Sequence, residues 1–215
     1  MRRAALGFRV HSGWAVMVAL AEPIAEPAVP TASMVIERCR IGLVGSGTAT
    51  RTAATVQPYH AARELDIERA RELIERCAGE ATRLAESAVR VAIERLRVQA
   101  WEAEACGILV ASGRPLPSLP DILASHPMIH TAEGELFRNA LVAAGESCGL
   151  RVIGVKERGL YALAATALGA PAERLRSDVD GLGRTLGPPW GQDEKYAALV
   201  AWVALSEHCR QPIDD

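Results

Sequence analysis

The sequence predicts an α/β protein in which helices flank a mixed sheet. Three strand-like segments come first, at Ala4–Val10, Trp14–Leu20 and Met34–Val44. Two further apolar segments, Ala105–Ala111 and Leu150–Val155, each follow a segment with helical periodicity. Three successive strands can pair antiparallel through short links, whereas strands separated by helices pair parallel. The order β-β-β-α-β-α-β-α therefore indicates an antiparallel portion that continues into a parallel one.

The first two strands form a predicted hairpin, because the link His11-Ser12-Gly13 between them is short and contains a glycine. Gly7 and Gly13 stand where a side chain would crowd the backbone or where φ is positive. Arg9, His11 and Ser12 are the polar side chains at this turn, and no carboxylate accompanies them. We therefore treat these three residues as candidate binding or catalytic residues.

The middle of the chain alternates predicted loops and one long helix. Glu22–Pro30 is a proline-rich connector, and Gly45–His60 is rich in Thr and Gly and is predicted to be a loop of the kind recruited for function. Ala61–Glu102 shows the longest helical periodicity, with Arg and Glu on its solvated face. Gly79 is a point at which this helix is expected to loosen or divide.

Four later segments are also predicted to be helical. They are Thr131–Ser147, Gly159–Leu168, Ala172–Leu186 and Asp193–Cys209. Pro127 argues against a regular helix over Ser125–His130, because proline disrupts a helix interior.

Composition bounds the class of protein. The 215 residues suffice for one large core, and we expect residues 1–215 to form a single domain. A net charge of −2 provides no global basic field, so nucleic-acid binding would require a local patch. The five cysteines form no CxxC pair, and no apolar stretch approaches the roughly 20 residues of a membrane span. We expect a cytoplasmic protein with reduced thiols and no membrane partner.

Three local stretches carry a resemblance to a known family. Leu6–His11 leads into Ser-Gly-Trp-Ala at Ser12–Ala15, Gly134–Val155 contains a helix and the late strand with the pair Val155-Lys156 just beyond it, and Asp193–Leu199 begins the last helix. Together with the order of elements, these stretches resemble the ribonuclease H-like superfamily, and within it the Holliday-junction resolvase (RuvC) branch. The resemblance implies an α/β fold with a ribonuclease H-like mixed five-stranded sheet flanked by helices.

The resemblance also implies a site from which this sequence departs. The family holds two divalent metals between three or four carboxylates, which stabilise the attacking and leaving oxygens of an in-line attack on phosphate. Arg9 or His11 stands where the family has its first carboxylate, and Ser112-Gly113 stands where a second is expected. Asp193 or Glu194 retains an acid at the last position. We therefore expect a divergent member without the standard two-metal nuclease site.

Histidines provide further candidates. His126 and His130 have the His-x-x-x-His spacing that can bind a transition metal on one helix face, although Pro127 argues against a regular turn and the sequence identifies no third ligand. A polar loop before a helix is the alternative interpretation.

A convergent acid–base cluster is a second interpretation of the histidines. If His60 faces the same end of the sheet as His11, these residues and one of the later pair would meet Glu133 or Asp193 and could transfer protons near neutral pH. Three unrelated surface histidines remain the alternative.

Two functional hypotheses follow. The first is a protein that binds a nucleotide, nucleic acid or protein partner without cutting phosphodiesters. Its candidate binding residues are Arg9, Ser12, Tyr59, His126, Glu133 and Lys156. The second is a hydrolase with a changed site that acts on a phosphate-containing substrate. Its candidate catalytic residues are His11, His60, His130, Asp193 and Glu194. An actin-like nucleotide-binding half is a third hypothesis and would require a homodimer. The sequence assigns no metal or other cofactor.

Overall fold

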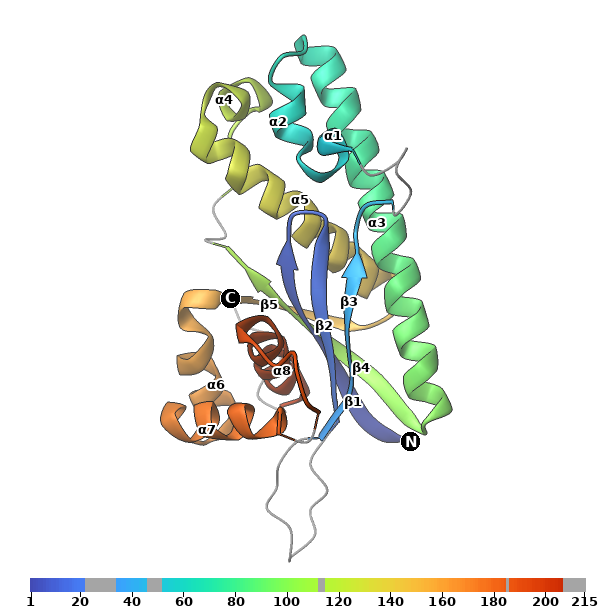
Figure 1. Cartoon of the computed structure of the whole chain (residues 1–215), viewed down its shortest axis with the longest axis vertical. Coiled ribbons are helices and arrows are strands. Elements are labelled where there is room, and N and C mark those ends of the chain that lie inside the picture. The colour runs from blue at the N-terminus through green and yellow to red at the C-terminus, as the bar shows by residue number, and fades with distance from the viewer. Residues whose placement is uncertain (22–33, 46–51, 112–114, 185, 207–215) are drawn as a thin grey trace, which may run out of the picture.

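A five-stranded sheet forms the centre of the molecule (Figure 1). The computed structural model describes residues 1–21, 34–45, 52–111, 115–184 and 186–206. The strands are β1 (Arg2–His11), β2 (Trp14–Ala21), β3 (Met34–Gly42), β4 (Trp101–Val110) and β5 (Arg151–Lys156). Their spatial order is β3-β2-β1-β4-β5, with β1–β2 and β2–β3 antiparallel and β1–β4 and β4–β5 parallel. The predicted mixed five-stranded sheet is confirmed.

The turn of the first hairpin contains two residues. His11 pairs with Trp14, so the strand continues one residue beyond the predicted end at Val10 and Ser12-Gly13 alone makes the turn. Gly13 has a φ of 79°, which glycine adopts without the steric cost that a side chain brings. The predicted need for glycine at this position is thus confirmed.

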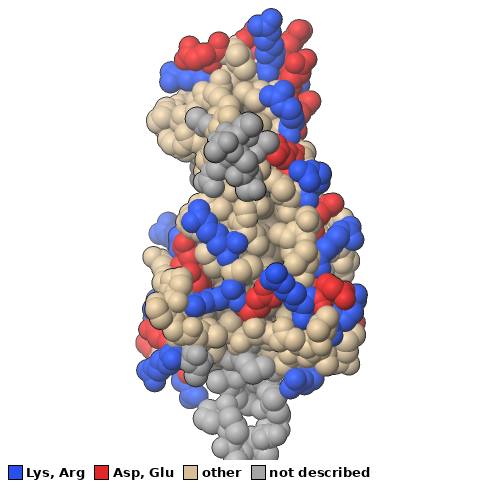
Figure 2. Space-filling view, turned by 45° about the vertical axis from the view of Figure 1, so that its right-hand side comes forward, with Lys and Arg blue, Asp and Glu red and all other residues tan. Residues whose placement is uncertain are grey.

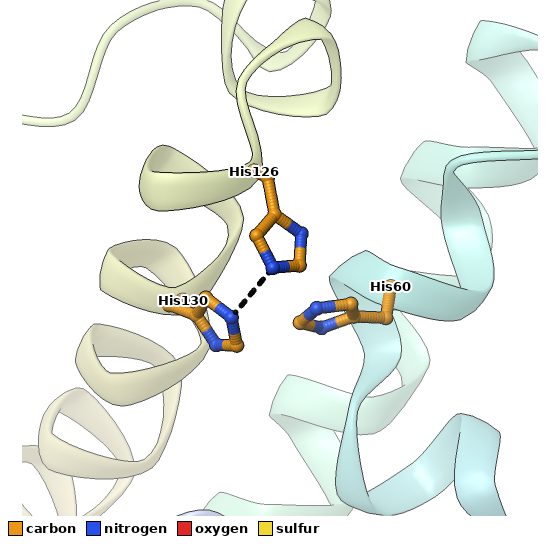
Figure 3. Close-up of side chains that lie close together, drawn as sticks. All are labelled: His60, His126 and His130. Atoms are coloured by element: carbon orange, nitrogen blue, oxygen red, sulfur yellow. Dashed lines mark hydrogen bonds between the residues drawn. The ribbon is translucent and has the colours of Figure 1, made fainter.

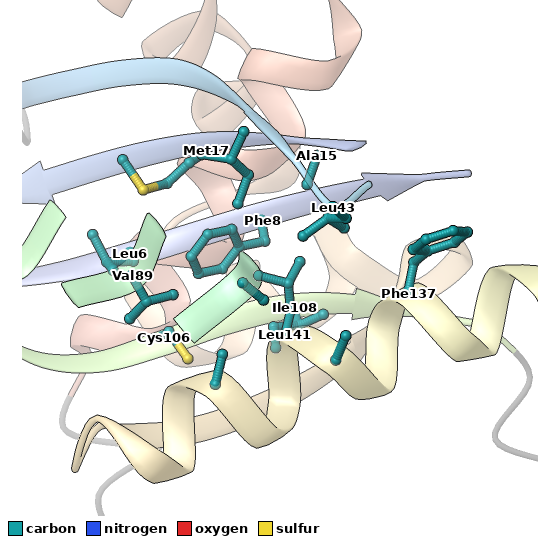
Figure 4. Packing of buried hydrophobic residues seen from close by; sticks show 14 of the residues in the cluster. Leu6, Phe8, Ala15, Met17, Leu43, Val89, Cys106, Ile108, Phe137 and Leu141 are labelled. Atoms are coloured by element: carbon teal, nitrogen blue, oxygen red, sulfur yellow. The ribbon is translucent and has the colours of Figure 1, made fainter. Parts of the chain in front are cut away.

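Two long helices cover one face of the sheet. They are α3 (Ile67–Val98) and α5 (His126–Ser147). Because side chains alternate along a strand, Leu6 and Phe8 of β1 point to this face, where they pack with Ile108 of β4 and Leu141 of α5 (Figure 4). This layer holds the larger part of the apolar core. The helix α3 continues through Gly79 without interruption, so the expected break does not occur.

Helix α8 (Gln192–Leu205) covers the other face. A side-chain nitrogen of Arg3 in β1 lies 3.3 Å from the Leu205 carbonyl oxygen, and His11 at the opposite end of β1 contacts Asp193. The helix therefore runs antiparallel to β1. Its sheet-facing side is built of small residues, namely Ala197, Ala198, Ala201 and Ala204, all fully buried.

Two glycines allow α8 to approach the sheet closely. Gly7 of β1 and Gly107 of β4 are register partners. A Cβ atom built on Gly7 would lie 1.9 Å from the carbonyl oxygen of Ala197, and one on Gly107 would lie 2.5 Å from that of Val200. The obstacles are main-chain atoms, so no side-chain rotation could relieve the clash.

Three short helices lie wholly or mainly outside the segments that the sequence analysis predicts to be helical. Helices α1 (Ala53–Val56) and α2 (Pro58–Ala62) lie in the second half of the predicted loop, and α4 (Leu119–Ala124) precedes α5. The prediction that Ser125–His130 is not helical is wrong. Helix α5 begins at His126, and Pro127 stands in the first turn, where the missing N–H would have no intrahelical partner.

The remaining helices follow β5. They are a 3₁₀ turn (Glu157–Gly159), α6 (Leu160–Leu168) and α7 (Ala172–Leu182). The proline-rich connector Glu22–Pro30 and the end of the predicted last helix lie outside the described residues. Among the helices that are described, none is both long and apolar enough to cross a membrane.

The glycine contact yields a first prediction. Gly7→Ala should lower the free energy of unfolding by about 3 kcal/mol, because the added methyl group overlaps main-chain atoms of α8. Gly79→Ala is the matched control. Its Cβ would meet nothing within 4 Å on an exposed helix face, and the change should raise stability by about 0.5–1 kcal/mol. Urea unfolding followed by circular dichroism measures both; equal effects of the two changes would contradict the close packing of α8.

The core cysteine yields a second prediction. Burial, with smaller contributions from Cys148 and Glu146, raises the pKa of the Cys106 thiol to about 12. Because alkylation requires the thiolate, less than roughly one Cys106 in a thousand is reactive at about pH 8.5 even if reagent enters. Iodoacetamide labelling followed by peptide mass spectrometry should modify half-buried Cys148 well before Cys106 in the folded protein and both equally in urea. Faster labelling of Cys106 in the folded protein would contradict its burial.

Candidate functional site

The carboxyl end of β1 lies beside the N-terminus of α8. Arg9 and His11 alternate in phase with Gly7, so they project to the face that α8 covers. Asp193, in the first turn of α8, contacts both. Nη1 of Arg9 lies 3.0 Å from Asp193 Oδ1, and Nε2 of His11 lies 2.9 Å from Asp193 Oδ2. Each oxygen of this carboxylate therefore faces a different nitrogen side chain.

A second acid contacts Arg9. Nη2 of Arg9 lies 3.2 Å from Oε1 of Glu157, which directly follows β5. The guanidinium carbon also lies 5.1 Å from the ring centroid of Tyr196 on α8. The Arg9 side chain is only 19% exposed, so the cation is held between two acids and an aromatic ring. We refer to Arg9, His11, Glu157 and Asp193 as the β1 edge cluster.

An aromatic pair adjoins the β1 edge cluster. The His11 ring stacks on Trp14 with 4.1 Å between centroids and 12° between planes, and Arg40 lies over the same indole at 3.6 Å. A pocket of about 360 Å³ opens here, lined in part by Trp14, Arg40 and Asp193. Such stacked cationic and aromatic groups can receive planar or anionic ligands.

The candidate residue Glu194 has a different environment. Its carboxylate accepts a hydrogen bond of 2.8 Å from the backbone N–H of Gly191, the residue that precedes α8. This contact satisfies a donor at the helix N-terminus and favours the start of α8. Glu194 therefore positions Asp193 through the helix, while Asp193 alone contacts Arg9 and His11.

The other histidines form a separate group. His60 of α2 and His126 and His130 of α5 point toward one another (Figure 3). The Nε2 atoms of His126 and His130 are 3.1 Å apart, and the His60 ring lies edge-on to both, with centroid distances of 5.3 and 4.7 Å. Nδ1 of His60 lies 2.9 Å from Oε1 of Glu133, which is 2% exposed. We call His60, His126, His130 and Glu133 the histidine cluster.

The structure thus divides the convergent site that the sequence suggests. His60, the later histidines and Glu133 meet, whereas His11 and Asp193 meet on the face of the sheet that α8 covers. His60 supplies the third nitrogen beside His126 and His130. The acid–base interpretation of the sequence includes His60, whereas the metal interpretation identifies no third ligand. Pro58 in the first turn of α2 is the only local sign that this part of the loop is helical.

The remaining candidates lie at the margins. Ser12 forms the hairpin turn, and Lys156 is exposed at the end of β5. Tyr59 packs against the core, and burial, with a smaller contribution from Glu133, raises the pKa of its hydroxyl. The Ser112-Gly113 position after β4 lies outside the described residues. The sequence analysis does not identify Glu157 or Tyr196 as site residues. Their contacts with Arg9 in the structure are the signal that places them in the site.

Charges of both signs are interleaved over the visible face of the molecule (Figure 2). Exposed pairs such as Arg97 with Glu94 on α3 and Arg174 with Asp178 on α7 illustrate this pattern. Such pairs contribute little to stability and largely cancel at a distance. Any attraction for a polyanion therefore has to arise from a local group of cations.

Comparison with known proteins identifies the fold. No model of a protein family and no curated protein sequence matches the chain. Among solved structures, RuvC of Thermus thermophilus is similar, with a TM-score of 0.50 and 13% identity over 93% of this chain and 92% of that one. The same protein in complex with a Holliday junction substrate gives a TM-score of 0.50 and 10% identity over 94% and 91% of the two chains. This chain therefore has the ribonuclease H-like fold of RuvC, at 13% sequence identity.

Proposed function

We propose that this chain is a single ribonuclease H-like domain that binds nucleic acid and does not cleave it by the standard two-metal mechanism. The observation that carries the proposal is the position of Arg9, whose guanidinium lies between Asp193 and Glu157 at the end of β1. Nucleic acid as the ligand class is supported by the fold, since RuvC with the same fold is seen with a Holliday junction substrate.

The β1 edge cluster favours a fixed cation over bound magnesium. Mg²⁺ requires oxygen ligands in near-octahedral geometry, and phosphoryl transfer with two metals requires several carboxylates around them. Here β1 contributes Arg9 and His11, and both oxygens of Asp193 already face nitrogen atoms. A magnesium ion between these acids would have to displace the guanidinium and would be repelled by its charge.

A continuous series of contacts could bind a nucleic-acid strand. From the β1 edge cluster it extends to Trp14 and Arg40 on one side and, through Tyr196, to Tyr161 on the other. The Arg176 guanidinium lies 3.9 Å from the Tyr161 ring centroid. We define the arginine–aromatic surface as the following six residues: Arg9, Trp14, Arg40, Tyr161, Arg176 and Tyr196.

This surface supplies the two interactions that nucleic acid requires. Aromatic rings stack with bases of any sequence, and arginine side chains bind phosphate oxygens. Arg40 and Arg176 are exposed, which leaves their remaining N–H groups open to solvent. Because the net charge of the chain is −2, affinity must come from this local surface.

A second candidate function is a hydrolase with a changed site. The observation that favours it is the pair of His11 and Asp193, in which a half-buried carboxylate orients an imidazole at 2.9 Å. Such a pair can act as a general base toward water or a hydroxyl group. The two candidates differ in whether substrate is consumed.

Binding to labelled DNA tests the first candidate and provides the third prediction. Fluorescence anisotropy with single-stranded, duplex and four-way-junction DNA should show binding in EDTA as well as in Mg²⁺. Trp14→Ala and Arg40→Ala should each raise the Kd about tenfold or more, because Arg40 would bind a phosphate oxygen by a charge-assisted hydrogen bond of roughly 1.5–3 kcal/mol and Trp14 holds the Arg40 guanidinium in place. Arg97→Ala is the control, since Arg97 is exposed on α3, which covers the other face of the sheet. Failure of the wild type to bind, or equal effects of all three changes, would contradict the proposal.

Product analysis separates the candidates. Incubation of these DNAs with Mg²⁺ or Mn²⁺ should leave them intact. Metal-dependent cleavage that is lost in Asp193→Asn would refute the absence of two-metal chemistry. Hydrolysis of a phosphate ester that persists in EDTA and is lost in His11→Ala would establish the second candidate in place of the first.

A further inference from the structure

We propose that His60, His126 and His130 form a binding site for a transition-metal ion, for which Zn²⁺ is the probe. One nitrogen atom from each of the three side chains lies within 4.8 Å of the others. Two helices supply them, α2 and the first turns of α5. The site is distinct from the β1 edge cluster and does not depend on nucleic-acid binding.

The spacing of the two α5 histidines suits a tetrahedral ion. They are separated by one helical turn, so they project from the same side of the helix. Their Nε2 atoms are 3.1 Å apart. Zinc–nitrogen bonds of about 2.0–2.1 Å at tetrahedral angles separate two ligand nitrogens by roughly 3.3–3.4 Å. The pair therefore requires only a small adjustment to bind one ion.

The third histidine is oriented by a buried carboxylate. A carboxylate is an acceptor, so the 2.9 Å contact with Glu133 places the proton on Nδ1 of His60. The lone pair then lies on Nε2, the nitrogen free to bind a metal. Zinc-binding histidines are commonly held by a carboxylate in this way. Glu133 also accepts the backbone N–H of His60 at 3.1 Å, which fixes the residue as well as its ring.

The burial of Glu133 is a second, independent observation. Glu133 is 2% exposed, and no other charged residue in the described part of the chain is buried to this extent. A carboxylate in such a position is costly unless positive charge or hydrogen bonds compensate it. The two hydrogen bonds from His60 compensate part of this cost, and a divalent ion on the far side of the His60 ring would add positive charge.

The chemistry of the ligands indicates the class of ion. Three imidazoles with no oxygen or sulfur suit Zn²⁺ and similar first-row ions, whereas Mg²⁺ and Ca²⁺ prefer oxygen. His126 and His130 are exposed, so a fourth ligand can come from solvent. Three protein ligands and an open position differ from the closed four-ligand arrangement of structural zinc sites.

Metal titration of the full chain is the fourth prediction. After EDTA treatment and removal of the chelator, isothermal titration should show one Zn²⁺ bound per chain. His60→Ala and His130→Ala should each weaken binding by more than the roughly 10–100-fold expected for loss of an outer-shell partner. His11→Ala is the control and should bind as the wild type does, because His11 contacts Asp193 instead.

Two further measurements keep this test decisive. X-ray absorption of the bound ion should show nitrogen and oxygen neighbours without sulfur, which excludes binding by cysteine. His130 is exposed, so circular dichroism should show a folded variant. Absence of Zn²⁺ binding by the wild type, sulfur neighbours, or full binding by folded His130→Ala would each overturn the proposal.

Glu133 as a positioning residue provides the fifth prediction. Glu133→Gln keeps the size of the side chain but removes its negative charge, and it should weaken Zn²⁺ binding roughly 10–100-fold while one ion still binds. Glu135→Gln is the matched control on the same helix, where Glu135 pairs with Arg138, and should leave the affinity unchanged. Thermal unfolding without metal distinguishes a structural role. If Glu133→Gln lowered the Tm but not the affinity, its role toward the metal would be refuted.

Discussion

The contact between the α8 main chain and the paired glycines of β1 and β4 determines the rest of this face. Gly7 and Gly107 remove two side chains at the point where the helix crosses the sheet, where Ala197 faces Gly7 and Val200 faces Gly107. The helix is therefore held by dense main-chain packing. This close approach brings Asp193 within reach of both Arg9 and His11. A wider separation of helix and sheet would leave the acid out of contact.

Electrostatics at the end of β1 follows from that packing. Asp193 stands in the first turn of α8, where the helix dipole already favours an anion. Arg9 adds a permanent cation in a half-buried position, where ion pairs are screened less than at the surface. A single guanidinium thereby pairs with two neighbouring carboxylates, Asp193 and Glu157. The chemistry of this edge depends on these side chains, because fold alone does not determine function.

Local rules predicted the framework, whereas the sites depend on contacts between distant segments. The short link with Gly13 indicated the hairpin, and the alternation of strands and helices indicated the mixed sheet. Pro127 illustrates the limit of a local rule. Proline disrupts the interior of a helix but is well tolerated in its first turn, so its effect depends on where the helix begins, which here is His126. The acid–base interpretation placed His60 near one of the later histidines and Glu133 or Asp193, and the structure shows the contact with Glu133 but leaves His11 and Asp193 apart from it.

The two polar clusters are separated by the sheet. His11 projects to the α8 face in phase with Gly7, while α5, which holds Glu133, packs on the face that Leu6 and Phe8 occupy. Asp193 would therefore not be a ligand of an ion that the histidine cluster binds. The histidine cluster also does not support the main core, because His126 and His130 are exposed. His126 and His130 meet each other and the His60 ring, and His60 in turn contacts the buried Glu133, an arrangement that suits a bound ligand.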